Sequence, residues 1–111
     1  MTRVQEIIKV LDLKEHPEGG YFKETYRSKG FLNSNSLDEN YSGNRNYSTC
    51  IYFLLTSEQF SAFHKINQDE IWHFHEGSPI KLHTISESGK HHEFLIGNNI
   101  TKEEHPQLIV P

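Results

Sequence analysis

The chain of 111 residues has one cysteine, few prolines and no long apolar run. Because Cys50 stands alone, an internal disulfide is excluded, and its neighbours in TCIY indicate a buried position in a strand. No apolar run approaches the ~20 residues that cross a membrane. The first residues, MTRVQEIIKVLDLKEHPEGG, lack the uninterrupted apolar core of a signal peptide. These absences predict a soluble, cytoplasmic protein with no membrane partner.

Positive charge and aliphatic side chains are also limited. With neutral histidines the net charge is -4, and lysine and arginine form no cluster, so nucleic acid and anionic lipid are not expected as partners. Hydrophobic residues make up only 34% of the chain while aromatic residues reach 12%, which predicts a core that relies on Phe, Tyr and Trp. The length supports one domain, residues 1–111.

The hydrophobic pattern predicts one helix followed by short strands. Thr2 is a suitable cap for a helix whose apolar positions, ending at Leu11, follow helical spacing. Residues 16–20 (HPEGG) are typical of a turn, residues 28–46 of a long mobile loop, and residues 86–90 of a hairpin connection. The expected strands cover residues 21–26, 47–56, 60–64, 71–75, 79–85, 92–96 and 107–110. This pattern indicates an all-β sandwich or barrel.

The richest group of reactive side chains lies in SAFHKINQDEIWHFHEG, residues 61–77. Alternation along its second half predicts a strand with Glu70, Trp72 and Phe74 on one face and the neighbouring histidines on the other. We expect Phe74 to pack in the core, because large aromatic side chains are mostly buried. We place the candidate site on His64 and on Glu70 and Trp72, which share one face of the predicted strand.

Three of these positions carry a resemblance to a known family. His64, Glu70 and Gly77 are spaced as in the first sequence motif of the cupins. Two departures are visible: Ile66 stands where a metal-binding cupin has a second histidine, and Glu58 stands where the motif usually begins with glycine. The ligand set of three histidines and one glutamate that the motif implies is therefore already short of one ligand.

Three separated segments make the resemblance narrower. HPEGGYFKETYRS, IYFLLTSEQFSAFHK and DEIWHFHEGSPIKLH together resemble the small-cupin family of uncharacterised function, sometimes numbered the fifth cupin family. The resemblance implies a cupin-type double-stranded β-helix, a jelly-roll barrel similar to the sugar-nucleotide 3,5-epimerases, with a ligand pocket inside and a homodimeric assembly. The second cupin motif would continue beyond Pro111, so we expect the single domain to lack its C-terminal strands.

The leading functional hypothesis is an isomerase-like or epimerase-like enzyme that needs no cofactor. His64 would be a general base toward a small sugar or other polar carbonyl compound, and Glu70 would fix its tautomer or stabilise its charged form. Trp72 would form a flat wall for a sugar ring or nucleobase. Tyr21 and Tyr26 would add hydroxyl groups to this ligand-binding surface.

Two alternatives remain open. His64 and Glu70 suit Fe, Mn, Ni or Zn, with His75 or His83 as a third ligand, although two protein ligands alone hold such a metal weakly. A noncatalytic ligand-binding module fits a pocket with an incomplete ligand set.

The remaining histidines have structural interpretations. His16 is expected to hydrogen-bond to the glycine turn, and His73 to lie with His75 at a subunit interface. His91 and His92 are expected in a solvated turn.

Overall fold

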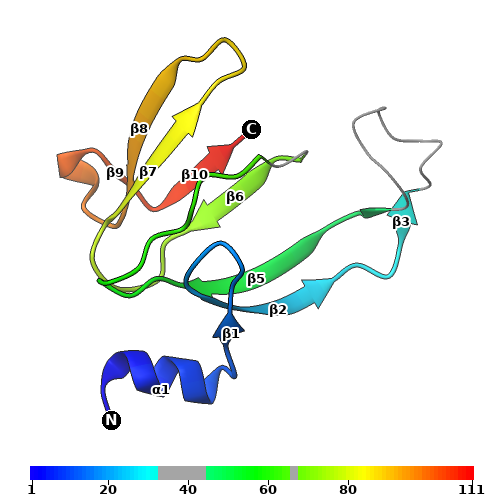
Figure 1. Ribbon diagram of the computed structural model, residues 1–111, viewed down its shortest axis with the longest axis vertical. Helices are drawn as coiled ribbons and strands as arrows, with labels where there is room; N and C mark the ends of the chain where they lie inside the picture. The colour runs from blue at the N-terminus through cyan, green and yellow to red at the C-terminus, as the bar shows by residue number, and fades with distance from the viewer. Residues whose placement is uncertain (33–44, 66–67) are drawn as a thin grey trace. The chain divides into compact units, whose positions relative to one another are not determined.

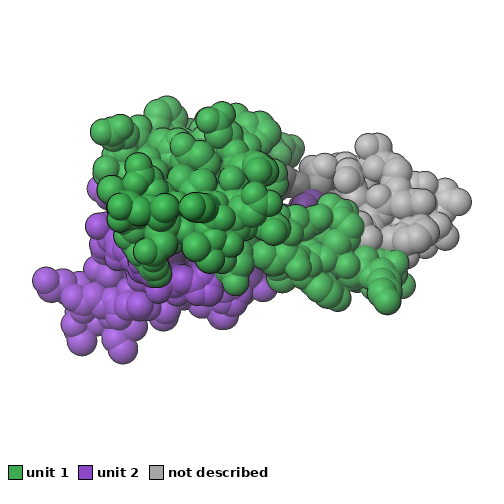
Figure 2. Space-filling model, turned by 90° about the horizontal axis from the view of Figure 1, so that it is seen from below, with its two compact units in different colours: residues 1–67 green, residues 68–111 purple. Residues whose placement is uncertain are grey.

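The computed structural model describes residues 1–32, 45–65 and 68–111, and it divides into two compact units, residues 1–67 and 68–111 (Figures 1 and 2). The described elements of unit 1 are α1 (Arg3–Val10), β1 (Lys14–Glu15), β2 (Tyr21–Arg27), β3 (Phe31–Leu32), β4 (Arg45–Asn46) and β5 (Thr49–Leu54). Those of unit 2 are β6 (Glu70–His73), β7 (Ile80–Ile85), β8 (His91–Ile96), the 3₁₀ helix η2 (Ile100–Lys102), β9 (Glu104–His105) and β10 (Gln107–Val110). The predicted strand-rich fold with one short N-terminal α-helix is confirmed.

The N-terminal helix begins with a capping box. The backbone N–H of Gln5 donates to Thr2 Oγ1 at 3.1 Å, and the Thr2 N–H donates to Gln5 Oε1 at 3.0 Å. Each side chain therefore accepts the backbone N–H of the other residue. The half-buried side chains of α1 and its C-cap are those that the helical spacing predicts: Val4, Ile7, Ile8 and Leu11.

The helix ends in a Schellman motif. Leu13 N–H donates to the Ile8 carbonyl at 3.0 Å, and Asp12 N–H donates to the Lys9 carbonyl at 3.3 Å, while Asp12 adopts a left-handed φ of 55°. Leu13 is only 5% exposed and is the buried hydrophobic residue of unit 1 among those described. A hydrogen bond from Lys14 lowers the pKa of the exposed Asp12 carboxyl.

The main sheet of unit 1 has the strand order β1-β2-β5 and is antiparallel throughout. Phe22 and Phe53 are register partners across β2 and β5. The His16 ring lies edge-on against both, with centroid distances of 4.9 Å and 5.3 Å. The sheet thus packs an aromatic cluster at the point where the chain enters from the glycine turn.

The turn at residues 16–20 forms as predicted. His16 N–H donates to the Gly20 carbonyl at 2.8 Å, and Glu18 N–H donates to His16 Nδ1 at 3.0 Å, which confirms the hydrogen-bonding role expected for His16. Gly19 and Gly20 have φ values of 111° and 81°, a region that favours glycine. A Cβ on Gly19 would lie 2.2 Å from the carbonyl oxygen of Phe60. The turn therefore lies directly against the chain that follows β5.

The predicted strand at residues 60–64 is wrong. These residues have no strand assignment and run as an irregular segment along the glycine turn, where Ala62 N–H donates to the Glu18 carbonyl at 2.8 Å. The Ala62 N–H in this segment pairs with a turn instead of a neighbouring strand.

The predicted loop at residues 28–46 is partly structured at its ends. β3 and β4 pair antiparallel, with Phe31 opposite Asn46. The buried Ser28 donates its hydroxyl to the Gly30 carbonyl at 3.0 Å and accepts the Ser48 N–H at 3.1 Å. Residues 33–44 lie outside the described residues.

Unit 2 contains two sheets. β6 pairs antiparallel with β10, and β7 forms a hairpin with β8, to which β9 adds in parallel (Figure 1). Exposure alternates along β7, and Ile96 at the end of β8 is 1% exposed. The predicted hairpin turn is confirmed by the Ser86 N–H donating to the Lys90 carbonyl at 2.9 Å and by the positive φ of Gly89. His91 and His92, expected in that turn, lie in β8 instead, because the turn closes at Lys90.

Two expectations about burial need correction. Cys50 lies in a strand as expected, but it is exposed, because the first four residues of β5 are exposed on both faces. Among the described residues the buried hydrophobic side chains are Leu13 and Ile96, both aliphatic. Aromatic residues such as Phe22, Phe53, Trp72 and Phe74 are half-buried, whereas Tyr26, Tyr47, Phe60 and Phe63 are exposed. None of the helices in the described part of the chain has the length and apolar character needed to span a lipid bilayer.

Candidate functional site

The predicted site residues are distributed over both units. Unit 1 contains Tyr21, Tyr26 and His64, and unit 2 contains Glu70, Trp72, His75 and His83. We describe the two groups separately, and the pairing of His64 with Glu70 stays a prediction.

His64 is positioned by its own backbone segment. Its Nδ1 lies 2.8 Å from the Ala62 carbonyl oxygen. A carbonyl oxygen only accepts hydrogen bonds, so Nδ1 carries the hydrogen, and in the neutral ring Nε2 holds the lone pair. Ala62 is in turn fixed to the Glu18 carbonyl in the glycine turn. The turn thus sets the position and tautomer of an exposed imidazole whose Nε2 can accept a proton.

Glu70 and Trp72 form a pair on the half-buried face of β6, as the alternation predicts. Trp72 Nε1–H donates to Glu70 Oε1 at 2.6 Å. This bond uses one carboxylate oxygen and fixes the side chain along the strand. Their register partners on β10 are Val110 and Leu108. Trp72 is therefore both a flat surface and the hydrogen-bond donor that orients the carboxylate.

Tyr21 and Tyr26 lie on one face of the β2–β5 sheet. Strict alternation would separate two residues five positions apart, but the register shifts between Glu24 and Tyr26. Tyr21 is opposite Leu54 and Tyr26 is opposite Cys50, and these two β5 residues share a face. The bulge brings the tyrosines to the same side, with Tyr21 half-buried and Tyr26 54% exposed.

His75 and His83 do not join Glu70 as ligands of one ion. The strand predicted at residues 71–75 is shorter in the structure: β6 ends at His73, so His75 lies beyond it and is exposed. His83 lies in β7, in a different sheet from Glu70, and contacts His91. Within the described residues, no group of three or more His, Cys, Asp or Glu side chains is arranged to hold a metal ion. Glu70, His75 and His83 therefore do not form a three-ligand metal site within unit 2, and a ligand set that includes His64 stays a prediction.

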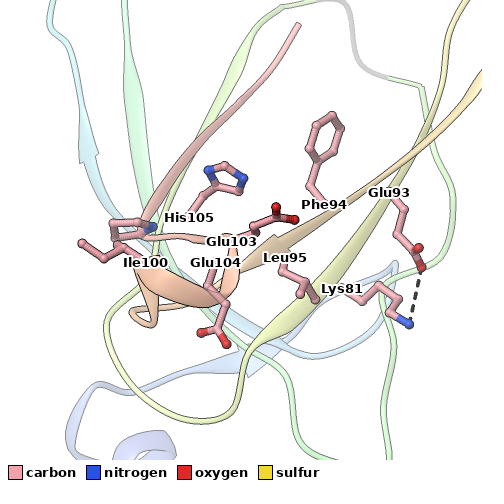
Figure 3. A pocket seen from close by; sticks show the side chains of 9 residues that line it. Lys81, Glu93, Phe94, Leu95, Ile100, Glu103, Glu104 and His105 are labelled. Carbon is pink, nitrogen blue, oxygen red and sulfur yellow. Dashed lines mark ion pairs between the residues drawn. The ribbon is translucent and has the colours of Figure 1, made fainter.

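Unit 2 has an open hollow of about 820 Å³ beside β8 and β9 (Figure 3). Glu103, Glu104 and His105 contribute polar groups to its wall, and Lys81 pairs with Glu93 at 3.4 Å. The apolar part of the lining consists of Phe94, Leu95, Ile100 and Pro106. The predicted site residues are not among those that line it in the described structure. The wall carries acidic, basic and apolar side chains together, so it does not indicate one class of ligand.

Sequence reasoning missed two contacts at these histidines. The contact between His64 and the Ala62 carbonyl could not be found from the sequence, because every residue has a backbone carbonyl. The contact between His83 and His91 had a usable signal: the two histidines flank the predicted hairpin turn at residues 86–90, so the strands on either side of it were expected to pair.

The strand-rich fold and the spacing of His64, Glu70 and Gly77 define a cupin-like protein, and the comparison with protein families agrees. The family described as Cupin superfamily (DUF985) matches residues 5–111. The chain belongs to this family, which confirms the resemblance stated from the sequence.

The relatives are themselves described as uncharacterised or hypothetical. The chain is 34% identical, over 99% of its length, to the uncharacterized protein YML079W of Saccharomyces cerevisiae. A hypothetical protein from Leishmania major has a similar solved structure, with a TM-score of 0.86, 32% identity and 99% of this chain covered. The structure of protein SO0799 from Shewanella oneidensis covers 100% of this chain, with a TM-score of 0.83 and 33% identity. The chain spans 57% of the yeast protein and 65% of each of these structures.

Proposed function

We propose that this cupin domain binds a small polar carbonyl compound, such as a sugar derivative, and moves a proton on it with His64 Nε2 as the base. The observation that carries the proposal is the 2.8 Å contact between His64 Nδ1 and the Ala62 carbonyl oxygen. The family resemblance implies a homodimer, and we place the protein in the cytoplasm as part of the proposal.

The chemistry needs only proton transfer. Nε2 removes a proton from the carbon next to a carbonyl group, and the electron pair of that C–H bond moves to give an enolate. The Ala62 carbonyl accepts a hydrogen bond from Nδ1–H in both the neutral and the protonated ring, and it stabilises the imidazolium that forms. Return of the proton to another carbon, or to the other face of the same carbon, gives isomerisation or epimerisation. A positioned base of this kind contributes roughly 10²–10⁴-fold to rate.

Glu70 and Trp72 supply recognition in this proposal. The indole N–H holds the carboxylate in one orientation, where it accepts hydrogen bonds from ligand hydroxyl groups. The indole face provides a flat apolar surface for a ring. The hydroxyl groups of Tyr21 and Tyr26, on one face of their sheet, are further hydrogen-bonding groups for a polar ligand. The proposed proton transfer needs no metal ion, and no step is derived through one.

Deuterium exchange tests this proposal directly. The full chain is incubated in D₂O with a panel of free ketoses, ketose phosphates and nucleotide-linked ketosugars, and loss of the C–H signal beside each carbonyl is followed by proton NMR. We expect exchange in at least one compound, lowered about a hundredfold or more in His64→Ala and His64→Gln. His92→Ala, which removes another exposed imidazole, is the control and keeps the wild-type rate.

Two results contradict the proposal. If no compound exchanges, or if His64→Gln exchanges at the wild-type rate, His64 is not the base. A compound that raises the melting temperature without exchanging supports the noncatalytic binding module instead.

A further inference from the structure

Two histidines meet on the exposed face of the β7–β8 hairpin in unit 2. His83 Nδ1 lies 2.9 Å from His91 Nε2. The two rings are nearly parallel, with an interplanar angle of 16° and a centroid distance of 5.2 Å. His83 is opposite Glu93 in the register and His91 is opposite Ile85, so the two histidines are diagonal neighbours on one face.

We propose that His83 and His91 form a binding site for a divalent transition metal with tetragonal coordination, Cu²⁺ in the first place. Histidine nitrogens bind such metals at about 2.0–2.1 Å. Two nitrogens at right angles around one ion are then about 2.8–3.0 Å apart, and two nitrogens at the tetrahedral angle about 3.3–3.4 Å apart. The 2.9 Å between the two nitrogens is a hydrogen-bond distance in the metal-free hairpin, and it is also the separation that the right-angle arrangement preferred by Cu²⁺ and Ni²⁺ requires.

Glu93 supports the ligand role of His83. Its Oε1 lies 3.9 Å from His83 Nε2, the ring nitrogen that does not face His91. Lys81 Nζ lies 3.4 Å from the same carboxylate oxygen and holds it over the hairpin. A carboxylate near the second nitrogen favours the tautomer with hydrogen on Nε2, which leaves the lone pair on Nδ1 for the metal. At 3.9 Å the two atoms are not hydrogen-bonded, and a small movement of the carboxylate would give the hydrogen bond that usually orients a metal-binding histidine.

Metal binding at this site needs no gain or loss of a proton on either ring. In the metal-free hairpin, His91 Nε2–H donates to His83 Nδ1. When the ion binds, His91 moves its hydrogen to Nδ1, and both rings stay neutral while a small rotation turns the two lone pairs onto the ion. Water fills the other coordination positions, because His83 and His91 are both exposed. The site is separate from His64 and does not depend on the proposed catalysis.

Titration with Cu²⁺ alone tests the site. The full chain in a weakly coordinating buffer is followed by calorimetry and by electron paramagnetic resonance, in which nitrogen hyperfine splitting reports bound imidazole. We expect one strongest Cu²⁺ site whose dissociation constant rises at least tenfold in His83→Ala and in His91→Ala. Glu93→Gln raises it about tenfold or more, as expected for a group that orients a ligand. His92→Ala, one residue along β8, leaves it within about twofold, since adjacent strand residues face opposite sides.

Circular dichroism of each variant confirms that it folds, and His83→Gln provides a second variant with little change in volume. The proposal is overturned if His83→Ala and His91→Ala both bind Cu²⁺ as the wild type does, or if His92→Ala weakens binding equally. Ni²⁺ is expected to bind more tightly than Zn²⁺ at this site. The opposite order would overturn the right-angle geometry.

Discussion

At the residue scale, the chemical state of the key histidines depends on single neighbouring atoms. The Ala62 carbonyl sets the tautomer of His64, and the ring of His91 faces His83. The residue types at these positions were visible in the sequence, and His64 was one of the positions that carried the cupin resemblance. Their partners were not, because a backbone carbonyl or a diagonal neighbour becomes adjacent only after the chain has folded.

The bond between Trp72 and Glu70 gives a prediction at this scale. Replacing Glu70 with Leu leaves the half-buried indole N–H without its acceptor and should lower the free energy of unfolding by about 1–2 kcal/mol. Glu70→Gln keeps an acceptor oxygen and should cost less than about 1 kcal/mol. Trp72 is the single tryptophan, so its fluorescence reports both unfolding by urea and any change around the indole. Equal losses in the two variants would show that this hydrogen bond contributes nothing.

At the element scale, the strands were predicted better than their connections. The alternation from Glu70 and the hairpin around residues 86–90 are local properties, and both formed as expected. The segment at residues 60–65 and the bulge in β2 were missed, because both depend on what packs against the backbone. These two features matter for the site, since one positions His64 and the other brings Tyr21 and Tyr26 to one face.

Gly19 and Gly89 form a matched pair for testing how the turn supports this segment. Both have positive φ, but a Cβ on Gly19 would meet the Phe60 carbonyl at 2.2 Å, whereas nothing lies within 4 Å of one on Gly89. Gly89→Ala should cost only the backbone strain, about 1 kcal/mol. Gly19→Ala should cost at least about 2 kcal/mol and should shift the NMR signals of His64. Similar losses in denaturant unfolding, with His64 unchanged, would show that the turn does not hold the segment.

At the scale of the whole molecule, the sequence was sufficient to identify the cupin family and the strand-rich fold. Three separated segments contributed to that identification, and the family match over residues 5–111 confirmed it. The burial pattern was less predictable: the fully buried side chains of the described chain are aliphatic, whereas the abundant aromatic residues are half-buried or exposed. Composition gives the amount of apolar surface but not which side chains the strands cover.

The tautomer of the neutral His64 ring tests the central claim most directly. A long-range ¹H–¹⁵N correlation spectrum of the ¹⁵N-labelled full chain, recorded with the ring neutral and assigned with His64→Gln, shows which nitrogen carries the hydrogen. The proposed base requires hydrogen on Nδ1, bound to the Ala62 carbonyl, and a lone pair on Nε2. A spectrum with the hydrogen on Nε2 would contradict the account, because the exposed nitrogen would then be a donor instead of a base.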